Sequence, residues 1–243
     1  MTGRVALVTG AAQGFGADIA RALAAEGARL LLTDLSEGVH DVAAELGALS
    51  MIADVEQRQD HQDMVARAVA DYGRLDLAVN NAGIVHPPMP LAKVPEDMTR
   101  RIIEVDLLGM AWALQAQIPV MRRQGGGVIV NIASVAGLVG APGLGIYAAA
   151  KHGVVGLTRT AAAECARDGI RVNAICPAFA RTAMVDDLLA QDAEAEAALV
   201  RGVPMRRVAD RAEIVQAVIW AAAPENSFMT GQAIAVDGGI TAI

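Results

Sequence analysis

Short apolar segments alternate with amphipathic segments of helical length along almost the whole chain. The seven candidate strands are RVALVT, LLLTD, ALSMIAD, LDLAVNN, GVIVNIAS, IRVNAICPA and AIAVDGG. Continuous apolar character and β-branched residues are typical of strands buried on both faces. The alternation predicts a parallel sheet with helices on both of its faces. We therefore expect a single doubly wound α/β domain of the Rossmann type over residues 1–243, with a seven-stranded parallel sheet.

The charge and the rare residues restrict the partners of such a domain. The formal net charge is −7, and Lys and Arg form no run, so no nucleic acid is expected as a partner. Two cysteines, Cys165 and Cys176, are too few for a disulfide framework, which favours the reducing cytoplasm. The four histidines show no metal-ligand spacing, so we expect no metal site.

The stretch 128–150 carries no charged residue and is long enough to span a membrane. It contains Asn131, Ser134 and several glycines, however, and it begins with the pattern of a buried strand. The apolar run at the N-terminus is too short for a secretory signal. We therefore expect neither membrane insertion nor export.

A glycine-rich turn, TGAAQGFG, joins the first candidate strand to a helical segment. Gly10, Gly14 and Gly16 let backbone amides at a helix N-terminus approach a pyrophosphate. Asp34 ends the second candidate strand, where a carboxylate can bind ribose hydroxyls. The glycine spacing is G-x-x-x-G-x-G, which departs from G-x-G-x-x-G. Together these features predict a dinucleotide site at the carboxyl edge of the sheet.

The stretch GIYAAAKHG places Tyr147 and Lys151 four residues apart across three alanines. In a helix, residues at this spacing project from the same face, so the phenol and the ammonium converge. Taken alone, the pair is also compatible with a solvated helix surface.

The motifs TGAAQGFG, NNAG at 80–83, Ser134 and YAAAK follow one another in an order that resembles the short-chain dehydrogenase/reductase family. The resemblance continues through RVNAICPAFART and TGQAIAVDGG, so it covers nearly every residue. It implies a single doubly wound domain, assembled as a homotetramer. It also implies hydride transfer between a nicotinamide and a small-molecule alcohol or ketone.

The resemblance also implies catalytic roles. Tyr147 matches the general base for alcohol oxidation, and Lys151 matches the residue that holds the nicotinamide ribose and favours the tyrosinate. Ser134 matches the residue that binds the substrate oxygen. Asp106 stands where the family has a fourth catalytic residue, an Asn whose main-chain carbonyl holds a water. A backbone role survives this replacement, but an ionised carboxylate can only accept hydrogen bonds.

On the same resemblance we assign the cofactor contacts to Gly10, Gln13, Gly14, Phe15, Gly16, Asp34, Leu35, Asp54, Val55, Asn81, Tyr147, Lys151, Pro177, Ala180 and Thr182. No basic residue beside Asp34 could receive a 2′-phosphate, so NAD is expected. Two contacts have simpler interpretations. Asp54 is also typical of a turn at a strand end, and Asn81 is equally able to stabilise the centre of the sheet.

The substrate pocket is less constrained by the sequence. Its expected walls are SVAGLVGAPGLG, HPPMP, Phe179 and a lid over about 183–202, which are mainly apolar. A small or medium, mainly apolar substrate fits such walls. His86 is either a substrate contact or a plain loop histidine, and Cys176 is expected to be buried filler.

Two other functions stay open at this point. A reductase of 3-oxoacyl thioesters would typically use NADPH and would need basic residues that AAQGF at 11–15 and Leu35 do not supply. A non-catalytic NAD-sensing or scaffold protein is favoured by Asp106 but opposed by the intact Ser134, Tyr147 and Lys151.

Overall fold

The computed structural model describes residues 1–181 and 199–242. Its sheet has seven strands in the order β3-β2-β1-β4-β5-β6-β7, and every neighbouring pair is parallel. The strands are β1 (Val5–Thr9), β2 (Arg29–Asp34), β3 (Leu49–Ile52), β4 (Leu77–Asn80), β5 (Gly127–Ile132), β6 (Ile170–Pro177) and β7 (Ala233–Val236). The predicted doubly wound, seven-stranded sheet is confirmed.

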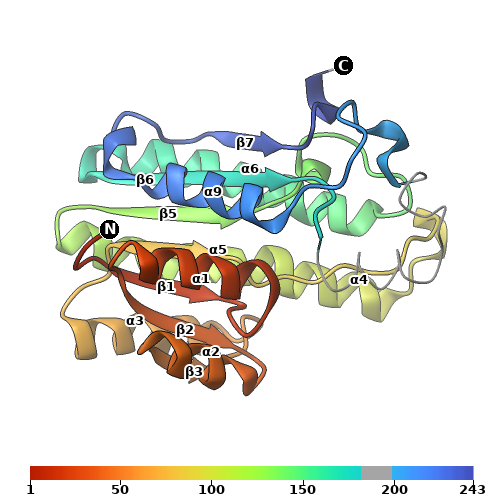
Figure 1. Ribbon diagram of the computed structural model, residues 1–243. Coiled ribbons are helices and arrows are strands. Elements are labelled where there is room, and N and C mark those ends of the chain that lie inside the picture. The colour runs from red at the N-terminus through yellow and green to blue at the C-terminus, as the bar shows by residue number, and fades with distance from the viewer. Residues whose placement is uncertain (182–198, 243) are drawn as a thin grey trace.

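Helices cover both faces of this sheet (Figure 1). One face carries α1 (Gly14–Ala25), α2 (Gly38–Leu46) and α9 (Arg211–Ala222), and the other carries α3 (Arg58–Tyr72), α5 (Gly109–Arg123) and α6 (Gly145–Cys165). Helix α4 (Glu96–Ile103) lies beyond the carboxyl ends of the strands. Because both faces are covered, β1 and β4 are buried along their whole length and can be apolar throughout.

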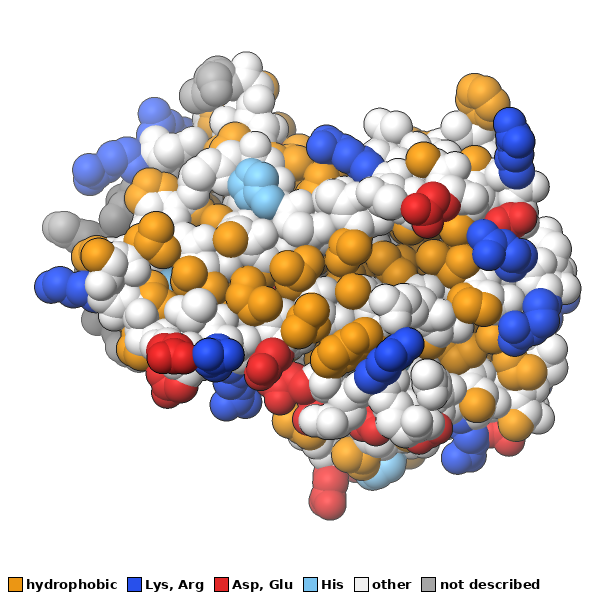
Figure 2. Space-filling view, turned by 180° about the vertical axis from the view of Figure 1, so that it is seen from behind, with side chains coloured by type: hydrophobic (Ala, Val, Ile, Leu, Met, Phe, Trp, Pro, Cys, Tyr) orange, Lys and Arg blue, Asp and Glu red, His pale blue; other side chains and the backbone are white. Residues whose placement is uncertain are grey.

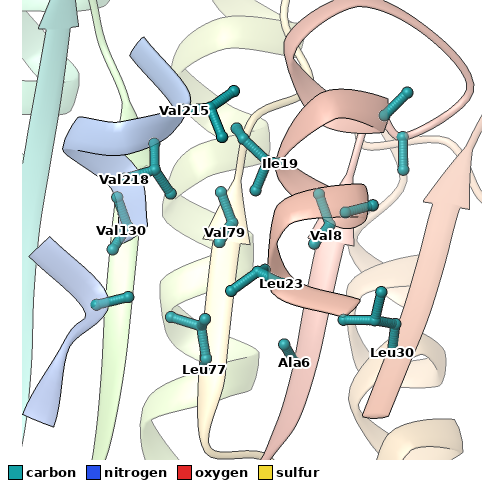
Figure 3. Packing of buried hydrophobic residues seen from close by; sticks show 14 of the residues in the cluster. Ala6, Val8, Ile19, Leu23, Leu30, Leu77, Val79, Val130, Val215 and Val218 are labelled. Carbon is teal, nitrogen blue, oxygen red and sulfur yellow. The ribbon is translucent and has the colours of Figure 1, made fainter. Parts of the chain in front are cut away.

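The largest apolar cluster fills the layer between the sheet and helices α1 and α9 (Figure 3). Ile19 and Leu23 of α1 pack over Val8 and Val79 of the sheet, and Val218 of α9 lies over the neighbouring strand. Burial of such side chains contributes about 1.5–3 kcal/mol each, so this layer fixes α1 firmly on the sheet. The loop that precedes α1 is thereby positioned at the carboxyl edge.

The direction of strand addition reverses between β1 and β4. The chain proceeds from β1 to β2 and β3 on one side and then returns to β4 on the other side. The loops that follow β1 and β4 therefore diverge at the carboxyl edge, and in open α/β sheets ligands bind at such a switch point. The fold thus places TGAAQGFG and NNAG on either side of the expected site.

The uncharged stretch 128–150 is divided between β5, a short 3₁₀ turn at Val135–Gly137 and the first turns of α6. This division agrees with the strand and helix expected from the sequence. Within residues 1–181 and 199–242, no helix has both the length and the apolar content needed to cross a bilayer.

Candidate active site

The glycine-rich loop after β1 is packed too closely for larger residues. Gly10 has a φ of +66°, and a Cβ atom there would lie 2.9 Å from the Cα atom of Ala82. A Cβ atom on Gly16 would overlap the carbonyl oxygen of Gly10 and lie 2.7 Å from Nδ2 of Asn81. These glycines therefore allow the loop, the first turn of α1 and the β4 loop to meet.

Asn81 joins the two loops of the switch point. Its Nδ2 donates to the carbonyl oxygens of Thr9 (2.9 Å) and Gly10 (3.1 Å). The Thr9 hydroxyl accepts hydrogen bonds from the backbone amides of Asn81 and Ala82. Both amide protons of Asn81 are thus used to hold the loop, which is the structural role considered from the sequence. A ribose contact by Asn81 remains a prediction.

Helix α1 starts directly after this loop, with Gln13 as its N-cap. The Gln13 side chain makes no capping hydrogen bond, and Phe15 packs against the apolar cluster below α1. The amides of the first turn of a helix have no partner within the helix. They are therefore suited to an anion, as the sequence predicted for Gly14 and Gly16.

Asp34 is fixed at the end of β2 by backbone amides. Its Oδ2 accepts from Ala12 N and its Oδ1 accepts from Ser36 N, both at 2.9 Å. The carboxylate is half-buried, while the neighbouring Leu35 side chain is 64% exposed. The structure thus presents a fixed negative charge beside an exposed apolar side chain, next to the glycine loop.

Asp54 and Val55 follow β3. Oδ1 of Asp54 accepts from Glu56 N at 2.9 Å, so Asp54 forms the turn considered as its simpler role. The carbonyl oxygen of Val55 lies 3.0 Å from Nε2 of His61, a buried histidine not singled out from the sequence. Burial lowers the pKa of His61, while its bond to Val55 acts in the opposite direction. Cofactor contacts by Asp54 and Val55 remain predictions.

Tyr147 and Lys151 lie on the first two turns of α6, as their spacing indicated. Nζ of Lys151 is 5.4 Å from the centre of the Tyr147 ring. Lys151 is only 3% exposed, whereas Tyr147 is partly exposed. A solvated surface pair is therefore excluded for Lys151, because its ammonium is enclosed by protein.

Asp106 lies beside this lysine. Its Oδ2 is 3.3 Å from Nζ of Lys151, and its Oδ1 accepts from Ile84 N at 2.8 Å. Oδ2 is a buried oxygen without a hydrogen-bond partner among the described residues, so its contact with Lys151 is an ion pair. Nζ of Lys151 also donates to the carbonyl oxygen of Ile132 at 3.3 Å. The carboxylate of Asp106 therefore lies directly beside the ammonium of Lys151.

Burial and charge oppose each other in this pair. Burial raises the pKa of the Asp106 carboxyl above its usual value, although the charge of Lys151 acts to lower it. Burial lowers the pKa of Lys151, but the Asp106 carboxylate and Tyr147 more than offset this effect, so its pKa lies above the usual value. Lys151 therefore keeps its positive charge despite being enclosed.

Asp106 reaches this position from a π-helical turn, Glu104–Leu108, that joins α4 to α5. Such turns are frequently found at functional sites. Gly83 packs against the pair, because a Cβ atom there would lie 3.2 Å from both Asp106 Oδ1 and Lys151 Nζ. The NNAG loop therefore forms one wall of the Lys151 site.

Ser134 follows β5 at the same edge. Its Oγ accepts from Ala136 N at 3.1 Å and lies 3.5 Å from the carbonyl oxygen of Pro177, the last residue of β6. Ser134 therefore does cap the turn that follows it. The cap uses one lone pair of the hydroxyl, and its proton is donated to Pro177 O over a long 3.5 Å contact, so the proton can turn to a substrate oxygen instead.

Cys176, next to Pro177, is fully buried, as expected for filler. Burial raises the pKa of its thiol to about 11.

Ala180, an expected cofactor contact, is 3% exposed and pairs with Ala209 in an isolated parallel bridge. Thr182 lies outside the described residues, as does the expected lid from 183 to 198.

Two of the expected pocket walls lie side by side. Met89 N donates to the carbonyl oxygen of Gly143 at 2.9 Å, which joins HPPMP to the segment that precedes Tyr147. Phe179, the third expected wall, is 37% exposed. In the described part of the chain, no three His, Cys, Asp or Glu side chains are placed to hold a metal ion.

The structure contains a buried polar network that the sequence analysis did not predict. It connects β4 and β5 to the two helices behind them through Asn80, Gln117, Asn131 and Thr158. Asn80 and Gln117 exchange two hydrogen bonds, and Asn131 bonds Asn80 on one side and Thr158 of α6 on the other. The network fixes α6, and with it Tyr147 and Lys151, relative to the sheet. In the sequence, only Asn131, a polar residue inside an apolar strand, could have indicated this network.

Comparisons with known proteins agree with this geometry. Residues 10–241 match a family model described as enoyl-(acyl carrier protein) reductase. The chain is 41% identical over 99% of its length, and 97% of the relative's, to cis-4-hydroxycyclohexanecarboxylate dehydrogenase of Sinomonas cyclohexanicum. It is 39% identical to 2,5-dichloro-2,5-cyclohexadiene-1,4-diol dehydrogenase of Sphingobium indicum, over 100% of this chain and 99% of the relative.

A solved structure of levodione reductase superposes with a TM-score of 0.93 at 35% identity, and the match covers 100% of this chain and 99% of that one. These matches extend over nearly the full length of the chain, in agreement with the sheet order described above. The chain therefore belongs to the short-chain dehydrogenase/reductase family of oxidoreductases.

Proposed function

We propose that the protein transfers hydride between NAD(H) and a secondary alcohol or ketone whose skeleton is a six-membered ring. The observation that carries this proposal is the enclosed ammonium of Lys151 beside Tyr147, on the same sheet edge as Ser134 and the glycine-rich loop. The names of two relatives supply the ring, because both act on cyclohexane-type alcohols with a second polar group opposite the first.

The loop after β1 fits a dinucleotide. Side chains at Gly10 and Gly16 would fill the space that the loop needs, and the uncapped first turn of α1 offers amides to a pyrophosphate. Asp34 would accept hydrogen bonds from the adenosine ribose, and the exposed Leu35 would cover the adenine. Further contacts with the cofactor are assigned to Val55, Pro177, Ala180 and Thr182.

The preference for NAD over NADP follows from charge. Asp34 is fixed by two backbone amides and cannot turn away from a 2′-phosphate. The next residues, Leu35, Ser36 and Glu37, contain no cation that would compensate. A carboxylate in this position repels the extra phosphate and accepts hydrogen bonds from the ribose diol of NAD.

Each catalytic side chain has one task in alcohol oxidation. Ser134 donates a hydrogen bond to the substrate oxygen, and the Tyr147 oxygen accepts the hydroxyl proton. Lys151 favours the deprotonated tyrosine with its charge, and Asp106 holds Lys151 through the ion pair. The bound nicotinamide supplies the acceptor for the hydride that leaves the alcohol carbon. Reduction of a ketone returns the proton from Tyr147 to the oxygen.

A reductase of 3-oxoacyl thioesters is the second candidate, because the chain is 37% identical, over 99% of its length, to a 3-oxoacyl-(acyl carrier protein) reductase of Thermotoga maritima. The half-buried Asp34 and the absence of basic residues at 11–15 oppose the NADPH that such a reductase typically uses. The expected pocket walls are also mainly apolar. The ring alcohol or ketone is therefore the better supported substrate.

One set of assays tests this proposal. With 4-methylcyclohexanol as substrate, kcat/KM should be at least about tenfold higher with NAD than with NADP. Tyr147→Phe should lower kcat by about 10²- to 10⁴-fold and leave NAD binding nearly unchanged. Tyr72→Phe is the matched control, because Tyr72 is the only other tyrosine and its hydroxyl bonds Leu30 O far from the site. Equal use of NADP, or a Tyr147→Phe variant within a few-fold of wild type, would contradict the proposal.

We extend the proposal to a homotetramer in the cytoplasm. Figure 2 shows hydrophobic side chains gathered in a band across the face that carries α3, α5 and α6. Two further large apolar side chains are exposed: Trp220 of α9 is 51% exposed, and Phe228 is fully exposed. Exposed apolar surface of this extent supports contacts with further copies. Light scattering on the purified protein tests the tetramer, and two free, buried cysteines suit a reducing compartment.

A further inference from the structure

His86 is a buried histidine that the proposed mechanism does not use. Its side chain belongs to the loop after β4 and is only 4% exposed. Nδ1 lies 2.8 Å from the carbonyl oxygen of Pro87. Nε2 has no hydrogen-bond partner among the described residues. Buried polar atoms almost always form a hydrogen bond, so the missing hydrogen bond of Nε2 needs an explanation.

The contact with Pro87 determines the chemistry of the second nitrogen. A carbonyl oxygen only accepts hydrogen bonds, so Nδ1 must carry the proton. In the neutral imidazole the other nitrogen is then a bare acceptor. The partner that Nε2 lacks is therefore a donor, and an alcohol hydroxyl supplies one.

The loop that carries His86 is tied to the candidate active site at both ends. On one side, Ile84 N donates to Asp106, and Gly83 packs against Lys151. On the other side, Met89 N donates to Gly143 O, four residues before Tyr147. His86 is thus midway along a segment that runs from the Lys151 site to the start of the helix bearing Tyr147.

We propose that Nε2 of His86 accepts a hydrogen bond from a second hydroxyl of the substrate, on the ring carbon opposite the reacting one. This inference rests on the proposed function and names the substrate class for the same site: a ring alcohol or hydroxyketone with oxygen at positions 1 and 4. His86 is a specificity-determining residue in this scheme, and the unpaired nitrogen is satisfied only when such a substrate is bound. Substrates without the second hydroxyl leave it unpaired and are disfavoured.

The test compares two substrates of nearly the same shape, cis-cyclohexane-1,4-diol and cis-4-methylcyclohexanol, with NAD. In wild type, kcat/KM should be at least about tenfold higher for the diol, after a factor of two for its equivalent hydroxyls. His86→Phe should remove this preference by raising KM for the diol, while kcat/KM for 4-methylcyclohexanol stays within about threefold. His86→Gln keeps an acceptor and should retain part of the preference.

His152→Phe is the matched control, because this exposed histidine of α6 bonds Ala148 O within its own helix. A wild-type enzyme that oxidises both substrates equally would overturn the inference and leave the proposed function intact. Equal losses for both substrates in His86→Phe and His86→Gln would assign His86 a structural role, which also overturns it. Failure of wild type to oxidise either substrate would instead contradict the proposed function.

Discussion

The two halves of the carboxyl edge hold their functional groups in different ways. Around β1 to β3 the backbone does the holding: Gly10 and Gly16 allow close approach, and backbone amides bind both oxygens of Asp34. Around β4 to β6 buried side chains hold one another, as in the bonds of Asn131 and in the pair of Lys151 with Asp106. The arrangement of the first half requires the absence of side chains at its glycines. The arrangement of the second half requires the polar atoms of particular side chains.

This difference teaches which substitutions each half tolerates. In the half from β1 to β3, a change matters when it adds volume, because backbone groups cannot retract. In the half from β4 to β6, a change matters when it removes a polar atom, because its buried partner is left unpaired. Three substitutions separate these cases.

The largest effect is expected from Gly16→Ala. The added methyl group overlaps the backbone carbonyl of Gly10, so the loop must move away from α1. Overpacking against backbone costs about 3 kcal/mol, which corresponds to NAD binding about 100-fold weaker. Titration of intrinsic fluorescence or calorimetry measures this Kd. Gly38→Ala is the control, since its Cβ atom would meet only ordinary contacts at 3.5 and 3.7 Å. Similar Kd values for the two variants would show that the loop is not held by close packing.

Asn131→Leu tests the half from β4 to β6. It keeps the approximate volume but removes two hydrogen bonds, one with Asn80 and one with Thr158. The free energy of unfolding should fall by about 1–3 kcal/mol, and kcat should fall because α6 loses a connection to β5. Urea denaturation measures the first effect. The exposed Gln59→Leu, which loses only a surface bond to Asp63, should change stability by less than about 0.5 kcal/mol. An Asn131→Leu protein as stable as wild type would argue against a side-chain network.

The smallest effect is expected from Asp106→Asn, and it concerns pH. An ionised Asp106 favours the ammonium of Lys151, whose pKa is raised, and disfavours the negative tyrosinate that oxidation needs. Replacing the carboxylate by an amide removes that negative charge. The acid limb of kcat for alcohol oxidation should therefore move to lower pH, by about one unit or less.

Asp76→Asn is the control for this shift, since Asp76 is also buried but bonds Val5 N near the opposite edge of the sheet. Its profile should match that of wild type. Superimposable limbs for Asp106→Asn, or a move to higher pH, would mean that Asp106 is protonated and acts only as a neutral hydrogen-bonding group.

The comparison also explains what could be predicted from the sequence. The glycine turn and the spacing of Tyr147 and Lys151 are local patterns, so they indicated the tight loop before α1 and the shared helix face. The network around Asn131 joins residues 27 to 51 positions apart, which meet only through the strand register and helix packing. The approach of the Asp106 carboxylate to Lys151 depends on a π-helical turn that leaves no clear pattern of residues.

Cys176 has a consequence for the chemical durability of the protein. Its thiol, with a pKa near 11, stays protonated at neutral pH, and burial also raises the pKa of Cys165. These two are all the cysteines of the chain, and the thiolate is the form that attacks electrophiles. Unsaturated ketones and quinones, which alkylate exposed thiols, therefore meet no reactive sulfur here. The fold keeps both thiols unreactive. One of them lies beside Pro177, whose carbonyl oxygen lies near Ser134 at the proposed substrate site.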